Sequence, residues 1–115
     1  MTLRPLLAAA ALLLPGLPAH AIAVYGPGAE SCKDFLGYER DHVDVEVKAA
    51  VIWTEGFLAG VGGTLESMNR KPLRAVDSDA IHAHLVKFCG EYSSSTISQA
   101  AARLASVLIK ETQGP

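Results

Sequence analysis

Two cysteines, Cys32 and Cys89, constrain the fold of this 115-residue chain more than any other feature. The first 21 residues have the pattern of an export leader, and an oxidising compartment favours pairing of the two thiols. A disulfide between them would force two segments that lie far apart in the sequence to pack together. A redox-active pair and a pair of metal ligands are the alternatives. The chain lacks Cys-x-x-Cys, however, and two ligands alone do not make a metal site.

Residues 1–21 contain the three parts of a secretory signal. Arg4 supplies the positive start, residues 6–14 are continuously apolar, and Ala19-His20-Ala21 fits the small-x-small rule, which predicts cleavage after Ala21. The apolar run is far shorter than the roughly 20 residues that span a bilayer, so no membrane anchor is expected after cleavage. We therefore expect residues 22–115 to form one domain in the periplasm.

The charge balance excludes some classes of function. The chain has 10 Lys or Arg and 12 Asp or Glu, which gives a formal net charge of −2. A mildly acidic protein is not suited to coating nucleic acid or anionic lipid. A single small domain also has no room for a dinucleotide-binding fold. Neither nucleic acid nor a membrane is expected as a partner.

Helical periodicity dominates the remainder of the chain, and the expected helices cover residues 31–36, 45–68, 78–92 and 96–110. Ser31 is expected to cap the first helix, Asp44 the second, Asp77 or Ser78 the third, and Thr96 the fourth through a Thr-x-x-Gln capping box. Asn69 is expected to end the second helix, after a break or kink near residues 62–63. Residues 43–47 alternate with period two, so a strand there is the alternative.

The apolar side chains recur on one face of each expected helix. The buried faces are expected to contain Cys32, Phe35 and Leu36 in the first helix; Ala49, Trp53, Phe57, Val61 and Leu65 in the second; Ile81, Leu85, Phe88, Cys89 and Tyr92 in the third; and Ile97, Ala101, Leu104 and Leu108 in the fourth. The sequence therefore predicts an all-α fold, a small bundle of about four helices with one disulfide between Cys32 and Cys89.

No catalytic motif is present, and the expected disulfide removes both thiols as nucleophiles, so we expect neither an enzyme nor a cofactor. His82 and His84 resemble a metal pair, but on a helix they point about 200° apart, so exposed side chains and no metal site are expected. His42 is expected in a small electrostatic cluster with Asp41 and Asp44. Glu55 is expected to be solvated.

Glycines at helical spacing form the most distinctive feature of the second helix. Gly56, Gly60 and Gly63 leave a bare stripe along which another backbone can approach closely. Packing against the alanine-rich last helix is one interpretation. The other is a docking face for a partner chain or a second copy in a homodimer, with Trp53 and Phe57 beside it. Because Trp53 shares a stripe with Phe57, it is expected in the core rather than as a binding hot spot.

The arrangement of these residues resembles the HdeA/HdeB type of small periplasmic protein. The matching positions are Cys32, Phe35, Leu36, Trp53 and Cys89. The resemblance implies an acid-activated chaperone that binds unfolded proteins. The glycines of residues 56–63 and the alanine-rich tail depart from that type. At about pH 2 the chain without its leader would carry nine Lys or Arg and three His against neutral carboxyls, about +12 in all, and such self-repulsion opens small domains.

The run from Trp53 to Gly60 also resembles the Rap1a/Tai type of immunity protein. That resemblance implies a specific partner, a cell-wall amidase that the protein inhibits. Those proteins have a second disulfide, for which this chain lacks the cysteines. The chain is therefore expected to bind other proteins, either many unfolded clients or one specific partner.

Overall fold

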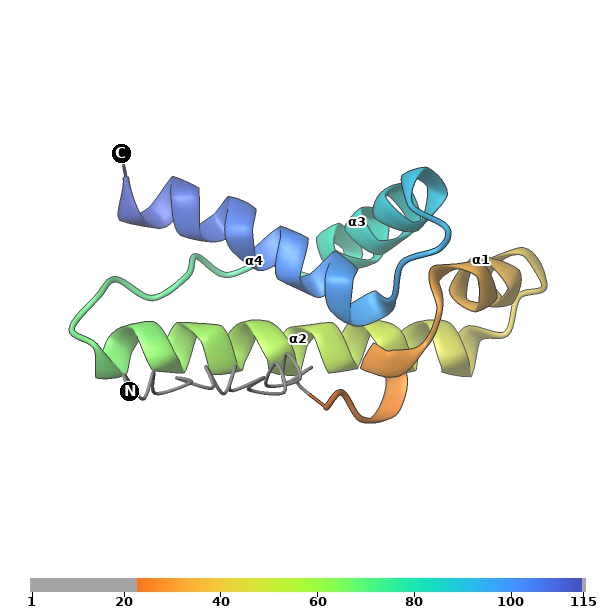
Figure 1. Ribbon diagram of the computed structural model, residues 1–115, viewed down its shortest axis with the longest axis horizontal. Coiled ribbons are helices and arrows are strands. Elements are labelled where there is room, and N and C mark those ends of the chain that lie inside the picture. The colour runs from red at the N-terminus through yellow and green to blue at the C-terminus, as the bar shows by residue number, and fades with distance from the viewer. Residues whose placement is uncertain (1–22, 115) are drawn as a thin grey trace, which may run out of the picture.

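The computed structural model describes residues 23–114 and shows helices without strands in that range (Figure 1). A short 3-10 helix, η1 (Gly26–Ala29), precedes α1 (Cys32–Arg40), α2 (Asp44–Ser67), α3 (Ser78–Glu91) and α4 (Ile97–Gln113). The predicted small bundle of four helices with one disulfide is confirmed. The expected leader, residues 1–21, and its cleavage site lie outside the described residues.

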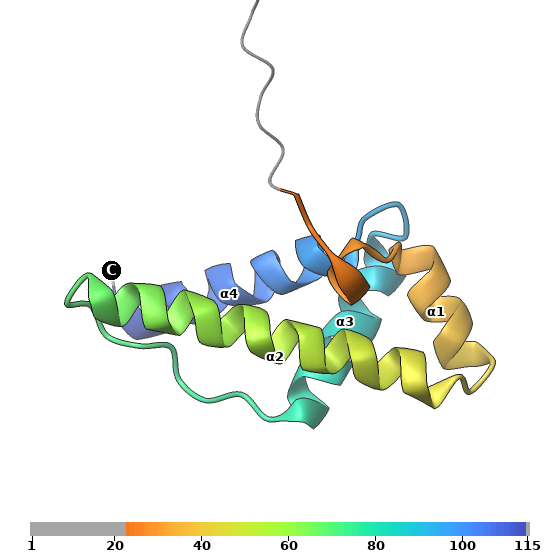
Figure 2. The ribbon, with the colours of Figure 1, turned by 90° about the horizontal axis from the view of Figure 1, so that it is seen from below.

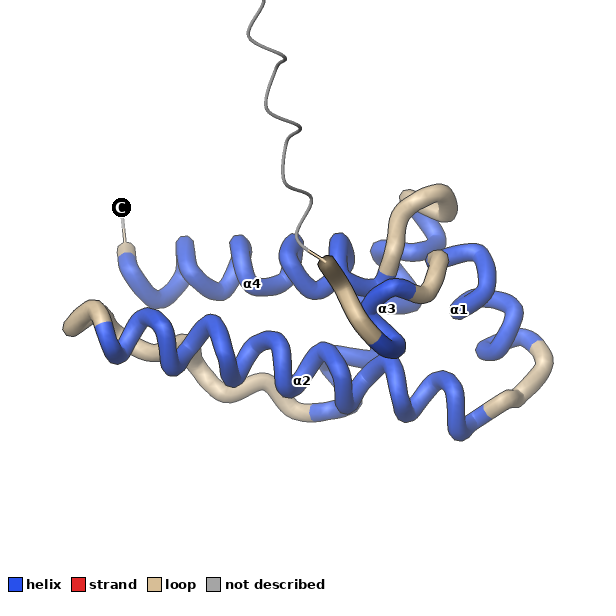
Figure 3. The backbone as a smooth tube through the Cα atoms, turned by 60° about the horizontal axis from the view of Figure 1, so that its bottom comes forward, coloured by secondary structure: helices blue, strands red, loops and turns tan. Residues whose placement is uncertain are grey.

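The bundle has a crowded end, where all four helices meet, and an open end, which only α2 and α4 reach (Figure 1). Helices α1 and α3 lie near the start of α2, whereas the last turns of α2 and α4 lie side by side at the opposite end (Figures 1 and 3). Residues 69–77 run back from the end of α2 to the start of α3 (Figure 2). The main core lies at the crowded end and contains Cys32, Phe35, Val47, Ala50, Val51, Ile81, Leu85, Cys89, Ile97 and Ala100.

The helix starts follow the predicted caps, with one exception. Ser31 accepts a hydrogen bond from the Asp34 amide at 3.0 Å, and Asp77 accepts one from the Ala80 amide at 2.8 Å. Thr96 forms the predicted capping box with Gln99. The cap predicted for α2 is wrong, because Asp44 is already helical and the preceding residue makes no side-chain cap. Asp44 instead places its carboxylate in the first turn, where the helix dipole favours an anion.

Helix α2 is continuous over 24 residues, so the predicted break near residues 62–63 is wrong. Each glycine costs about 1 kcal/mol in a helix interior, but packing along a long helix outweighs such local preferences. Helix α2 contacts η1, α1, α3 and α4, and Leu65 is buried near its end. Asn69 does end the helix, because at φ +55° it lets the Arg70 amide reach the Leu65 carbonyl at 2.9 Å.

The segment between α1 and α2 is shorter than predicted. Helix α1 continues through Gly37 to Arg40, which leaves only residues 41–43 as a connection, with His42 exposed at φ +56°. The alternative strand at residues 43–47 is wrong, because the segment from Asp44 onward is the first turn of α2. At the other end of the chain, α4 runs to Gln113, one turn beyond the predicted Lys110.

The buried face of α2 differs from the predicted stripe. Val47, Ala50, Val51 and Thr54 are buried in the first half, while the predicted Ala49, Trp53, Phe57 and Val61 are only half-buried. The observed buried face is shifted by about one residue from the predicted stripe, and a shift of one residue corresponds to a rotation of roughly 100° around the helix axis. Thr54 is fully buried, and its hydroxyl donates to the Ala50 carbonyl at 2.9 Å. Tyr92, predicted on the inner face of α3, is 46% exposed because α3 ends just before it.

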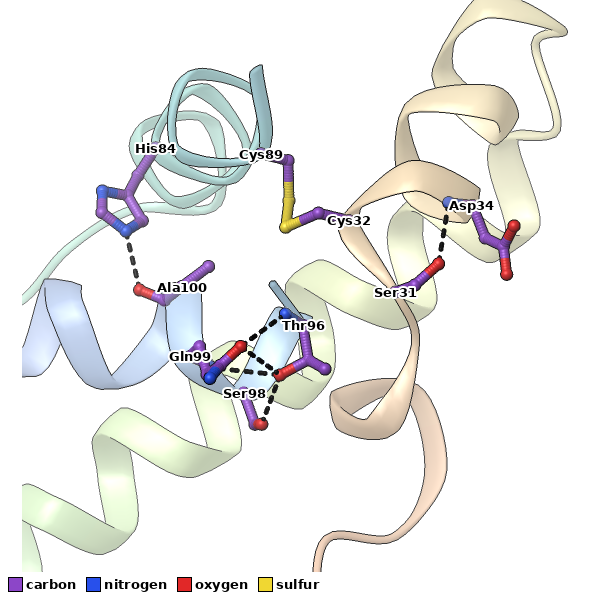
Figure 4. The surroundings of a disulfide bond; sticks show 9 residues. All are labelled: Ser31, Cys32, Asp34, His84, Cys89, Thr96, Ser98, Gln99 and Ala100. Carbon is purple, nitrogen blue, oxygen red and sulfur yellow. Dashed lines mark hydrogen bonds between the residues drawn. A yellow bond between two sulfur atoms is a disulfide. The ribbon is translucent and has the colours of Figure 1, made fainter. Parts of the chain in front are cut away.

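The predicted disulfide joins the first turn of α1 to the last turn of α3 (Figure 4). Cys32 and Cys89 have no exposed surface, and their Cα atoms are 4.9 Å apart. The Cys32 amide also donates to the Ser95 carbonyl at 2.8 Å, and the Ile97 amide donates to the Glu30 carbonyl at 3.0 Å. These contacts hold α1, α3 and the start of α4 together around the bond.

Candidate functional site

The three glycines of the predicted binding stripe are exposed on α2. A Cβ added at Gly56, Gly60 or Gly63 would meet no heavy atom of another element within 4 Å. The prediction that this stripe packs against α4 is therefore wrong. Ala100, Ala101 and Ala105 of α4 are buried, but not against these glycines. Within the described residues, the stripe is therefore an exposed surface of α2.

The glycines belong to a longer uncharged surface that we call the outer face of α2. Residues follow one another at about 100° around a helix, and this spacing places seven of them on one side. The outer face consists of Val45, Ala49, Ile52, Gly56, Gly60, Gly63 and Ser67. Val45 is 71% exposed and Ile52 is 64% exposed, and only Ala49 is half-buried. Seen from below, α2 lies in front of α3 and α4 (Figure 2).

Trp53 and Phe57 lie beside this face and contact the beginning of the described chain. Their rings stack with centroids 5.6 Å apart and an interplanar angle of 15°. The Trp53 indole donates from Nε1 to the Tyr25 carbonyl at 3.1 Å, and its ring covers Gly28 of η1. Trp53 is half-buried and not fully in the core, and its ring fastens η1 to α2. It is a structural neighbour of the outer face.

A shallow apolar groove of about 470 Å³ runs between the glycines and the aromatic edge. It is lined by Gly56, Phe57, Gly60, Val61, Thr64 and Leu65. The Thr64 hydroxyl already donates to the Gly60 carbonyl at 2.9 Å, so the groove offers no free charged or strongly polar group. Such a surface suits an apolar side chain of another protein, and it has no group for acid–base or nucleophilic chemistry.

The open glycines give a direct stability prediction. Gly56→Ala should raise the free energy of unfolding by about 0.5–1 kcal/mol, because alanine is the better helix former and its Cβ meets no neighbour. Gly26→Ala should lower it, because Gly26 has φ +67°. Urea unfolding at several protein concentrations measures both effects and separates them from self-association. A loss of stability in Gly56→Ala would contradict the open face.

A second hollow, of about 460 Å³, lies between α1, α2 and α3. Its lining includes Glu39, Glu55, Ser78 and His82, together with an apolar floor. His82 Nε2 is 2.7 Å from Glu39 Oε1, and the Ser78 hydroxyl donates to Glu55. Glu55 is half-buried and bonded, so the prediction of a solvated side chain is wrong. Local patterns did not indicate these pairs, because their members come from different helices.

The histidines have separate partners. His84 Nε2 lies 2.8 Å from the Ala100 carbonyl oxygen of α4 (Figure 4), whereas His82 contacts Glu39 of α1. Both residues are half-buried rather than exposed, because each lies against a neighbouring helix. Residues 23–114 contain no group of three His, Cys, Asp or Glu side chains placed to hold a metal ion. None of the helices in this range has the length and apolarity of a membrane-spanning segment.

Glutamates accept the side-chain hydrogen bonds that join separate elements. Besides Glu39 and Glu55, Glu30 accepts from the Tyr38 hydroxyl at 3.1 Å, and Glu111 accepts from Arg74 Nε at 2.7 Å. The hydrogen bond to Glu30, reinforced by its charge, raises the pKa of Tyr38. The contact with Glu111 likewise raises the pKa of Arg74. Within residues 23–114, these four contacts are all the side-chain-to-side-chain hydrogen bonds between residues more than three positions apart.

Comparison of the chain with protein-family models, with curated proteins and with solved structures found no match. The function must therefore be inferred from the residues themselves. What they provide is an uncharged outer face, a small disulfide-bonded core and a set of contacts that depend on glutamate.

Proposed function

We propose that this chain is an exported protein that binds other proteins, and that acid exposes its main binding surface. The observation that carries the proposal is the set of four glutamate contacts between elements. Each contact joins two separate segments, and each uses a carboxyl group as the acceptor. Strong acid neutralises carboxylates in general, so it would remove the negative charge on which these contacts rely. An acid-activated chaperone, the activity that the HdeA resemblance implies, uses such a response.

One of the four contacts lies at the open end of the bundle. There, Glu111 binds Arg74, and Gln113 Nε2 donates to the Lys71 carbonyl at 2.7 Å. These two bonds fasten residues 69–77 to the last turns of α4. Leu65 and Leu108 are buried at this end, but they lie outside the main core cluster. Because both side chains of this pair are largely exposed, loss of the Glu111 charge would only loosen the fastening, and repulsion between the remaining positive charges would be needed to expose these leucines.

The positive net charge of the protein in acid also favours opening of the bundle. In acid, Arg74 stays protonated while Glu111 becomes neutral, so the attraction disappears and the positive charge remains. The chain without its expected leader would carry about +12, and charges of one sign repel each other in a small domain. The contribution of the carboxylates to stability is present while they are ionised and is lost as they bind protons. The disulfide would keep α1 and α3 together in the opened state.

The test is aggregation of a periplasmic extract at about pH 2.5, with and without the purified protein. We expect suppressed aggregation together with dye binding and loss of near-ultraviolet circular dichroism, in acid only.

Glu111→Gln should raise the pH at which dye binding begins, because it removes one carboxylate contact already at neutral pH. Glu91→Gln is the matched control, since Glu91 is exposed and its side chain makes no hydrogen bond or ion pair with the other residues of 23–114. A protein that stays folded in acid, or that opens without suppressing aggregation, would contradict the proposal.

A second candidate function is binding of one specific partner at neutral pH, as in an immunity protein that inhibits a periplasmic enzyme. The exposed and uncharged outer face of α2 favours this candidate. A single stoichiometric partner captured at neutral pH, and lost in Gly60→Leu, would support it over the chaperone. Binding of many unrelated proteins in acid alone would support the chaperone.

A further inference from the structure

We propose that the outer face of α2 binds the same face of a second copy of this chain, with the two helices antiparallel. Val45 and Ile52 expose 71% and 64% of their surface there, so the single chain leaves two aliphatic side chains of this face in contact with water. Between residues 44 and 67, the outer face runs the length of α2 without a charged side chain. A helix of that length extends about 36 Å. The face is therefore long enough for an extended helix-to-helix contact.

The positions of large and small residues fit an antiparallel pair. If Gly56 of one copy lies opposite Gly60 of the other, then Ile52 lies opposite Thr64, in the space above Gly60 and Gly63. That space is open, because no atom lies within 4 Å of a Cβ built at either glycine. The two-fold symmetry of such a pair repeats the contact, so each Ile52 enters the groove of the other copy. The glycines also let the two backbones approach closely.

The charges at the two ends of α2 fit the same orientation. Asp44 and Glu46 lie in the first turn of α2, and Arg70 and Lys71 follow its last turn. All four side chains are exposed. An antiparallel pair places the acidic end of each helix beside the basic end of the other, and it also pairs the helix dipoles favourably. A parallel pair would place like charges together and set Ile52 against Ile52.

Self-association at neutral pH can be tested separately from the acid response. Sedimentation equilibrium should show a concentration-dependent dimer of the chain produced with its own leader and with its disulfide intact. Gly60→Leu should weaken the dimer at least about tenfold, because the side chain fills the space that Ile52 needs. Its fold should persist, since leucine favours helix and the first side-chain carbon at position 60 meets no neighbour. Gly90→Leu on α3 is the matched control, because Gly90 is equally open but lies away from this face.

Cross-linking tests the orientation. Chains carrying Ile52→Cys should form a disulfide with chains carrying Thr64→Cys when the two are mixed, and neither should link efficiently to itself. Efficient linking of Ile52→Cys to itself would overturn the antiparallel arrangement. A protein that is monomeric at every concentration, or a dimer that Gly60→Leu leaves unchanged, would overturn the interface. Neither result would bear on acid-induced client binding, which has its own measurement.

Discussion

Removal of the Cys32–Cys89 bond is expected to lower the free energy of unfolding by about 4 kcal/mol. The bond closes a loop of 57 residues, and the chain-entropy model assigns a loop of that size roughly this much stabilisation. A domain of this size has only about 5–10 kcal/mol in total, so the loss would leave a marginal fold. Urea unfolding of the oxidised protein and of the Cys32→Ala/Cys89→Ala variant measures the difference.

The double alanine variant is preferable to a double serine variant because both sulfurs are fully buried. Serine would place two hydroxyl groups in the core, and their desolvation would add to the effect of losing the bond. Serine should therefore cost more than alanine, and the gap between the two isolates that second effect. Equal stability of the alanine variant and the oxidised parent would contradict the importance of the bond.

The disulfide also has a part in the proposed acid response. The bond joins α1 and α3 at the crowded end, whereas Glu111 and Arg74 join the loop and α4 at the open end. Protonation acts on Glu111 and also on Glu30, Glu39 and Glu55 nearer the crowded end, but it leaves the disulfide unchanged. Acid should therefore open the bundle unevenly, with the end near Leu65 and Leu108 released while the cysteines stay paired. Without the bond, the same charge would unfold the whole chain.

Local sequence patterns predicted those parts of the fold that short-range contacts decide. Ser31, Asp77 and Thr96 begin their helices because each side chain caps an amide only three residues away. The disulfide could be predicted as well, because a chain with two cysteines offers only one intramolecular pairing. The all-α fold follows from the same periodicity.

The buried face of α2 could not be predicted from the sequence of that helix alone. Ala49, Trp53, Phe57 and Val61 form as regular a stripe as Val47, Ala50, Val51 and Thr54. The second set is buried because α1, α3 and α4 pack against α2 on that side, whereas Trp53 of the first set covers Gly28 of η1. The periodicity of the apolar residues shows that a helix has a buried face, and the neighbouring elements determine on which side of the helix that face lies.

The candidate site was predicted in part. The glycines of the outer face stood out because their spacing is helical, and the structure leaves them open. The contacts of Glu39 with His82 and of Glu55 with Ser78 join residues 43 and 23 positions apart. No local motif encodes such pairs, since they exist only once α1 and α2 are both packed against α3.

Gly28→Ala is expected to destabilise the protein by about 1–3 kcal/mol, the usual cost of overfilling a well-packed site. A Cβ at Gly28 would approach three atoms of the Trp53 ring to between 2.2 and 2.6 Å. An indole ring is rigid, so the whole side chain or the backbone of η1 must move. The movement should also break the bond from Nε1 to the Tyr25 carbonyl, which Trp53 fluorescence would report as greater exposure to water.

A smaller ring at position 53 should partly relieve the effect of Gly28→Ala. Trp53→Phe removes the outer ring atoms that the added methyl group meets, although it also removes the indole hydrogen bond. The double variant should therefore lose less stability than the sum of the two single variants, which is a favourable coupling in a double-mutant cycle. Additive losses would mean that Gly28 and Trp53 act independently, and the fastening of η1 to α2 would then need another explanation.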